Sequence, residues 1–295
     1  MSTITRGVLI FVVLSCMQGC LDIFAKIAVG HAPATLTNFY RYALLFICCL
    51  FWAFLRGSFL RLVAQTFTAP FLIARGLCQG VFGAAYFLSL SLLPLSIASS
   101  LFFTFPLFLI LISIVFLREK VHCSQWAFCL LGFTGMSLIM KPGGNASPEG
   151  LFFAMLAVAA FAFFQLITRK ISQKYDFLSM MFSTMFYAVA AALGVLLREG
   201  INPLLEIPHA GEYWLALLLF VSFAFMGNLL LITAFKYAPA SMLAPLSYVR
   251  LGVCVLASHV FFQERIDPAA WCGIVVILCS GTGQSLFSLF LDKKR

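Results

Sequence analysis

The chain has 295 residues, of which 63% are hydrophobic and only 10% are charged. Soluble proteins contain about 45–50% apolar and about 25% charged residues, so this composition excludes a soluble domain. The mean hydropathy of +1.05 indicates a protein that crosses a membrane several times. The formal net charge is +9, but the basic residues separate apolar runs instead of clustering on one polar face, which excludes nucleic acid as a partner.

The ten cysteines show no sign of a metal site or a disulfide framework. They occur singly or as the pair Cys48 and Cys49 inside apolar runs, and no two have C-x-x-C spacing. We interpret them as small apolar residues of the interior. The sequence also has no glycine loop of the Walker type. We therefore expect no metal, no cofactor and no ATP hydrolysis.

Apolar runs long enough to cross a bilayer follow one another along the whole chain. A helix needs about 20 mostly apolar residues to cross roughly 30 Å of hydrocarbon, where its backbone groups can bond only to one another. The sequence therefore predicts an all-α membrane protein with ten transmembrane helices in a lipid bilayer. The predicted spans are 7–29, 34–55, 70–93, 96–117, 124–140, 150–168, 177–197, 213–235, 241–262 and 268–290.

The basic residues favour one side of the predicted membrane. Twelve of the 19 Lys and Arg residues fall on the side of the amino terminus, four fall on the opposite side, and three lie inside spans. Because cytoplasmic loops carry the excess of positive charge, both termini are predicted to be cytoplasmic. The even number of spans requires both ends on one side. Arg41 and Arg75 lie near span ends, so we expect them to reach the headgroups.

The two halves of the chain resemble each other. An offset of 143 places Gly7 on Gly150 and Lys26 on Arg169. An offset of 145 places Pro94 on Pro239, Ser96 on Ser241, Glu119 on Glu264, Lys120 on Arg265, and Trp126 on Trp271. We predict two repeat units, 1–141 and 142–295, each with five spans. Because five is odd, the second unit must enter the membrane from the opposite side, so the two units are predicted to be inverted repeats.

Inverted repeats are typical of secondary transporters, whose two units move around a site near the membrane midplane and expose it to each side in turn. Some channels share this symmetry, so a passive channel stays an alternative. An intramembrane enzyme would need paired carboxylates, a Ser and His pair or a metal cluster at one depth. Asp22 is the one acidic residue inside a predicted span and supplies none of these, so we expect no enzyme activity.

The stretch from the third to the fifth span and its second copy around the ninth span resemble the drug/metabolite transporter superfamily, in particular its EamA type. The first copy reads Leu93-Pro94-Leu95-Ser96, Phe105-Pro106-Leu107 and Leu117-Arg118-Glu119-Lys120-Val121, and the second reads Ala238-Pro239-Ala240-Ser241, Ala244-Pro245 and Phe262-Gln263-Glu264-Arg265-Ile266. The resemblance implies a central cavity lined mainly by helices one, three, four, six, eight and nine. The copies differ where Pro106 coincides with Leu251 and Pro245 lies six residues earlier, so the fourth and ninth helices are not expected to bend alike.

The resemblance also implies the transport of a small organic metabolite, such as an amino acid, a nucleotide-like compound or S-adenosylmethionine. The stretch 93–107 is similar to members that exchange S-adenosylmethionine in intracellular bacteria. We therefore expect a transporter in the cytoplasmic membrane of a bacterium, with an S-adenosylmethionine-like substrate as the first choice. An amino-acid or drug exporter of the same fold is an alternative. Coupling to protons or to a counter-substrate stays open.

Arg250 is the clearest charged residue near the predicted midplane. It lies ten residues into its helix, which places it roughly 14 Å deep at 1.5 Å per residue. A charge there costs at least about 2.5–3.5 kcal/mol on insertion scales, so such a residue is functional or paired. The repeat places Phe105 at the equivalent position. We predict that Arg250 faces the cavity and binds a carboxylate or phosphate, with a structural ion pair or a contact with helix-end carbonyls as the alternative.

Asp22 lies inside the first span, and Lys26 follows one turn later. The two can form an ion pair. Alternatively, Asp22 provides a counter-charge for a cationic substrate, a proton site or a partner for Arg250 across the cavity. Gln18 is one turn before Asp22 and shares its face. Gln165 coincides with Asp22 under the offset of 143, which predicts equivalent cavity positions.

Other polar side chains inside the spans are expected to face inward, because lipid offers them no hydrogen bond. They bind either substrate or a neighbouring helix. Tyr248 is two residues from Arg250 and roughly 200° around the helix, so the two cannot face one narrow groove. The candidate substrate-binding residues are Arg250, Asp22, Gln18, Gln79, Tyr86, Gln165, Asn228 and Tyr248.

Overall fold

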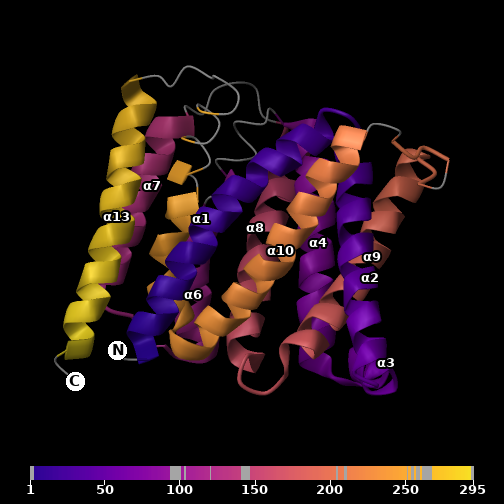
Figure 1. The fold of residues 1–295 in the computed structure, drawn as a ribbon. Coiled ribbons are helices and arrows are strands. Elements are labelled where there is room, and N and C mark those ends of the chain that lie inside the picture. The colour runs from indigo at the N-terminus through magenta and orange to yellow at the C-terminus, as the bar shows by residue number, and fades with distance from the viewer. Residues whose placement is uncertain are drawn as a thin grey trace.

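The computed structural model is a bundle of helices (Figure 1). It describes residues 3–93, 101–102, 104–119, 121–140, 147–203, 205–208, 211–250, 252–253, 256, 260 and 268–293. Within these residues every regular element is helical and no strand occurs, which confirms the all-α fold class for this part of the chain.

Each of the ten predicted spans contains helix. The long helices are α1 (Thr3–Val29), α2 (Ala34–Leu55), α4 (Pro70–Leu92), α6 (Phe105–Leu117), α7 (Cys123–Met140), α8 (Pro148–Ile171), α9 (Phe177–Glu199), α10 (Gly211–Tyr237) and α13 (Pro268–Lys293). Among the described residues, α2, α8, α9 and α10 are both long and apolar enough to cross a membrane. Large apolar side chains on the outside, such as Val115 at 71% and Phe152 at 64% exposure, suit contact with lipid.

Local sequence signals explain where several helices begin and end. Pro70 and Pro148 occupy the first turns of α4 and α8, where a missing N–H costs nothing. The Ser147 hydroxyl accepts a hydrogen bond of 3.1 Å from the Gly150 N–H, which caps α8. At the other end of the next helix, Gly200 follows α9 with a φ of 72°, a conformation that ends a helix at little steric cost.

The ninth predicted span is interrupted. Its described part consists of the short helix α11 (Ala240–Leu243), the 3-10 turn η1 (Ala244–Ser247) and further helical residues from Tyr248. Pro245 lies in the first turn of η1, whereas in the fourth span Pro106 lies in the first turn of α6. The two prolines thus mark helix starts at positions that do not coincide under the repeat offset of 145.

In the described part of the chain, one helix lies outside the predicted spans. Helix α3 (Phe59–Thr68) follows α2 and is too short to cross a bilayer. Leu62 and Thr66 are buried, whereas Leu60 and Phe67 are exposed by 80% and 58%. Helix α3 was not predicted, because its ten residues are too few to form an apolar run of spanning length.

The helices pack in pairs that the predicted repeat relates to each other. Helix α4 runs along α8 as α10 runs along α1, whereas the pairs α7 with α13 and α2 with α9 each join equivalent helices of the two units (Figure 1). Two glycine contacts follow the same relation. A Cβ atom at Gly7 would lie 2.7 Å from the Cβ of Ala238, and one at Gly150 would lie 2.5 Å from Cγ of Leu93. The start of α1 and the end of α13 lie at the same end of the bundle.

Replacing Gly7 with Ala should destabilise this packing. The added methyl group would meet the Cβ atom and the backbone nitrogen of Ala238 at 2.7 and 3.0 Å, and the backbone cannot move aside easily. Overpacking of this kind costs about 1–3 kcal/mol, so we expect a lower melting temperature in detergent. Gly194→Ala is the control, because nothing lies within 4 Å of its added methyl group. Equal melting temperatures for the two variants would contradict the close approach of α1 to residue 238.

Candidate central cavity

A cavity lies between α1, α6, α8, α10, η1 and the residues after η1, and its non-atom space, including space that is open to solvent, is about 320 Å³. Its apolar wall comes from four different helices. Phe11 and Leu14 come from α1, Phe105 from α6, Phe161 from α8 and Leu231 from α10. The rings of Phe105 and Phe161 meet edge to face at a centroid distance of 4.9 Å. These aromatic faces can contact a ring or a cationic group of a ligand.

Four polar residues complete the wall of the cavity. They are Gln18, Gln165, Ser247 and Arg250. The side-chain Oε1 of Gln165 and the Oγ of Ser247 are buried and have no hydrogen-bond partner among the described residues. A buried polar group without a partner costs about 1–3 kcal/mol, so these two atoms are suited to bind a polar ligand. Arg250 adds a positive charge and up to five N–H donors in a planar group.

Three of the predicted site residues therefore meet at this cavity. Gln18 comes from α1 in the first predicted unit, Gln165 from α8 in the second, and Arg250 joins them from beyond η1. Ser247 is a further lining residue that sequence reasoning missed. A lone serine carries little signal, and its exposure to the cavity depends on the 3-10 turn that begins at Ala244.

The structure places four other candidates away from the lining of this cavity. The Nε2 of Gln79 donates a hydrogen bond of 2.9 Å to the hydroxyl of Tyr42 in α2. Asn228 donates one of 2.9 Å to the carbonyl of Ala224, one turn earlier in α10. Gln79 thus binds a neighbouring helix, as the alternative to substrate binding expected, whereas the printed bond of Asn228 stays within its own helix.

The two tyrosines also contact neighbouring helices. Tyr86 packs against the ring of Phe102 at a centroid distance of 5.4 Å. Tyr248 is completely buried, and its ring fills the space beside Gly132 of α7. It thus faces a different side from Arg250, as the angle between the two positions predicts. Asp22 and Lys26 lie in α1, and their side chains are outside the described part of the structure.

The expectation that Arg75 reaches the headgroups is wrong. Its side chain is fully buried between α4, α8 and α9. Its Nε donates a hydrogen bond of 2.8 Å to Oγ1 of Thr168, and its Nη1 donates to the carbonyl of Met180 at 2.8 Å and to the hydroxyl of Thr184. The guanidinium also lies over the ring of Phe164, with Cζ 4.4 Å from the ring centre. Three helices pack closely enough around these acceptors to hold the charge in the interior.

Arg41 also turns inward. Its Nη2 donates a hydrogen bond of 2.6 Å to Oδ1 of Asn38, and its Cζ lies 5.2 Å from the ring centre of Phe220 in α10. Its Nε is buried and has no hydrogen-bond partner among the described residues. The position of an arginine near a span end therefore did not decide the direction of its side chain.

Comparison with known proteins identifies the architecture around this cavity. The model of the EamA-like transporter family matches residues 5–141 and again residues 148–282. A solved crystal structure has a TM-score of 0.78 to this chain at 19% identity and covers 97% of it and 98% of the other chain, which indicates the same fold.

Several curated relatives carry the names of transporters. The S-adenosylmethionine uptake transporter of Rickettsia bellii is 29% identical over 235 residues, which is 76% of this chain and 74% of the relative. The pseudopaline exporter CntI of Pseudomonas aeruginosa is 24% identical over 280 residues, covering 92% and 94% of the two chains. The riboflavin transporter of Vibrio cholerae is 24% identical over 181 residues, covering 61% and 59%.

Proposed function

Because the chain belongs to the EamA-like transporter family, we propose that it is a secondary active transporter that moves a small organic metabolite across the cytoplasmic membrane of a bacterium by alternating access. The observation that carries this proposal is the cavity between the helices of both predicted units, whose wall holds Arg250 and the polar atoms of Gln165 and Ser247 that have no partner in the described part of the chain. A pathway for a solute needs such a polar site enclosed within apolar walls.

The proposed substrate is a zwitterion related to S-adenosylmethionine. The planar guanidinium of Arg250 suits a carboxylate, which it can bind through two parallel hydrogen bonds. The rings of Phe11, Phe105 and Phe161 suit a flat ring or the positive centre of a sulfonium. The relatives named S-adenosylmethionine uptake transporters support this choice of substrate.

Two inverted repeat units, 1–141 and 142–295, are part of this proposal, with both termini in the cytoplasm. The family model's two matches support a duplicated chain. The related contacts of Gly7 with Ala238 and of Gly150 with Leu93 support the same duplication. Two related units offer two equivalent ways of closing one cavity, which is the requirement for alternating access.

Export is the second direction to consider, because the pseudopaline exporter, which matches 92% of this chain, is named an exporter.

The proposal is tested with purified protein in liposomes. Liposomes loaded with unlabelled S-adenosylmethionine should accumulate labelled S-adenosylmethionine from outside, because exchange through an alternating-access carrier is coupled across the membrane. Labelled amino acids and riboflavin serve as competing candidates. Flux that only equalises the two concentrations indicates a channel, and an absence of flux for every candidate contradicts the proposal.

A further inference from the structure

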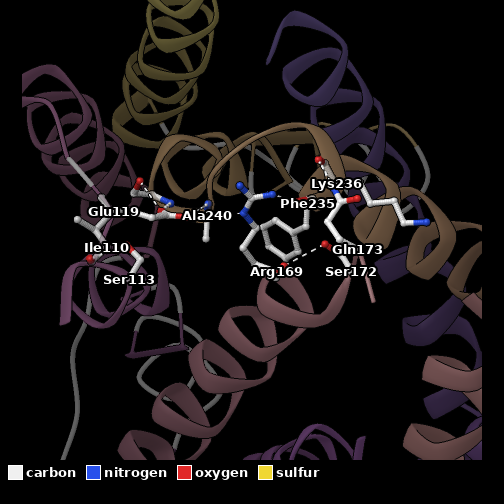
Figure 2. Close-up of polar contacts among 10 residues, drawn as sticks. Ile110, Ser113, Glu119, Arg169, Ser172, Gln173, Phe235, Lys236 and Ala240 are labelled. Carbon is white, nitrogen blue, oxygen red and sulfur yellow. Dashed lines mark hydrogen bonds and ion pairs between the residues drawn. The ribbon is translucent and has the colours of Figure 1, made fainter. Parts of the chain in front are cut away.

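A carboxylate joins the end of α6 to the start of α11 (Figure 2). Glu119 follows α6, and its Oε1 accepts a hydrogen bond of 3.2 Å from the N–H of Ala240. Its Oε2 accepts bonds of 3.1 and 2.8 Å from the N–H and the hydroxyl of Ser241. The side chain of Glu119 is only 12% exposed. One carboxylate therefore satisfies the free N–H groups at the start of α11 and crosses between the two predicted units.

An arginine extends this contact to two further helices. The Nε of Arg169, near the end of α8, lies 3.7 Å from Oε1 of Glu119. Its Nη1 donates a hydrogen bond to the carbonyl of Phe235 in the last turn of α10. One turn later, Gln173 donates a bond of 2.7 Å to the carbonyl of Lys236. Figure 2 shows Arg169 between the α10 carbonyl and the carboxylate, so α6, α8, α10 and α11 are tied together at one end of the bundle.

This contact lies directly beyond the cavity. Gln165 of the cavity wall is one turn before Arg169 in α8, and Leu231 of the wall is one turn before Phe235 in α10. Ser247 of the wall is six residues after Ser241. Three elements that line the cavity thus run on into the same polar contact.

Two features of the backbone suit a contact that forms and breaks. Helix α11 has four residues and is followed by the 3-10 turn η1, so this segment is a short piece instead of a rigid spanning helix. Arg118, directly before Glu119, has a φ of 52°. A left-handed conformation is unfavourable for a residue with a side chain, and here it turns the chain so that Glu119 points to α11.

We infer that the contact of Glu119 with Ser241 and Arg169 is a latch that closes this end of the cavity and opens when substrate passes. This inference rests on the proposed transport function. A buried ion pair contributes little net stability, because dehydration of both charges offsets most of their attraction. Water can therefore replace the partners of Glu119 at a small cost in free energy when α11 moves. Exposing an apolar contact of the same area to water would cost more.

The latch is tested by the access of a water-soluble, membrane-impermeant maleimide to the cavity. The reporter is Leu231→Cys in protein reconstituted in liposomes, and its labelling is read by peptide mass spectrometry, so that the native cysteines are distinguished. With reagent on the latch side, adding Glu119→Gln should speed labelling of residue 231 at least about tenfold, since the amide has no charge to face Arg169 and keeps only one of the two acceptor oxygens. Ser241→Ala should speed it about threefold, since a single hydroxyl bond is lost.

Glu199→Gln is the matched control, because Glu199 is exposed at the end of α9 and its substitution should leave the labelling rate unchanged. An unchanged rate in the Glu119 variant, or in Ser241→Ala if the Glu119 variant does not fold, overturns the latch. Protection of residue 231 by S-adenosylmethionine, measured with the latch intact, tests the proposed function separately. If S-adenosylmethionine does not protect residue 231 while the latch is intact, and the latch variants are still labelled faster, the proposed substrate is wrong and the latch stands.

Discussion

Replacing Arg250 with Ala is expected to abolish specific substrate binding while leaving the fold intact. Arg250 supplies a positive charge to the cavity wall, and hydrogen bonds between charged groups contribute about 1.5–3 kcal/mol each. Losing a two-bond contact with a carboxylate should therefore raise the Kd at least about 100-fold. The measurement is the shift in melting temperature of the purified protein on adding S-adenosylmethionine, since specific binding stabilises the folded state by mass action.

Two further variants separate the shape of the Arg250 side chain from its charge. Arg250→Lys retains the charge but loses the planar fork, so we expect weak binding instead of none. Arg198→Ala is the control for a general loss of charge, because Arg198 is exposed at the end of α9. If Arg250→Ala lowers the melting temperature without ligand but retains the ligand-induced shift, the residue serves the fold, and the structural ion pair is the correct alternative.

The sequence is informative about the cavity where depth and helical period decide which residue faces inward. Gln18, Gln165 and Arg250 were expected on the cavity and line it, because apolar spans of known length place each residue at a definite depth. The same period separates Tyr248 from Arg250, and Tyr248 packs against α7. Whether the three lining residues bind substrate stays a prediction.

The sequence is much less informative where a side chain depends on distant helices. The acceptors of Arg75 lie in α8 and α9, 93 to 109 positions later in the chain. Threonine hydroxyls and a backbone carbonyl give no charge signal that would mark them as partners of an arginine. Glu119 stands out in the sequence only through its match with Glu264, and its contact with Ser241 is 122 positions away. Such contacts depend on how distant helices pack against each other, and the residue pattern of a single sequence does not indicate that packing.

Arg75→Met should give the largest loss of stability among the arginine variants. Met fills a similar volume but removes the hydrogen bonds that join α4 to Thr168, Met180 and Thr184. Both threonine hydroxyls still donate to carbonyls one turn earlier in their own helices, which limits the damage. We expect a loss of about 2 kcal/mol, because the dehydration cost of the guanidinium is also removed, and a melting temperature lower by about 5 °C in detergent.

The control for this loss is Arg198→Met, which removes an exposed arginine and should change the melting temperature by about 1 °C or less. Arg75→Lys should fall between the two, because an ammonium retains the charge but cannot reach Thr168, Met180 and Thr184 with the same geometry. A melting temperature of Arg75→Met equal to that of the unmodified protein would mean that the hydrogen bonds only offset the dehydration of the charge. The burial of Arg75 would then serve something other than stability. The transport rate of the Arg75→Met variant would be the next quantity to measure.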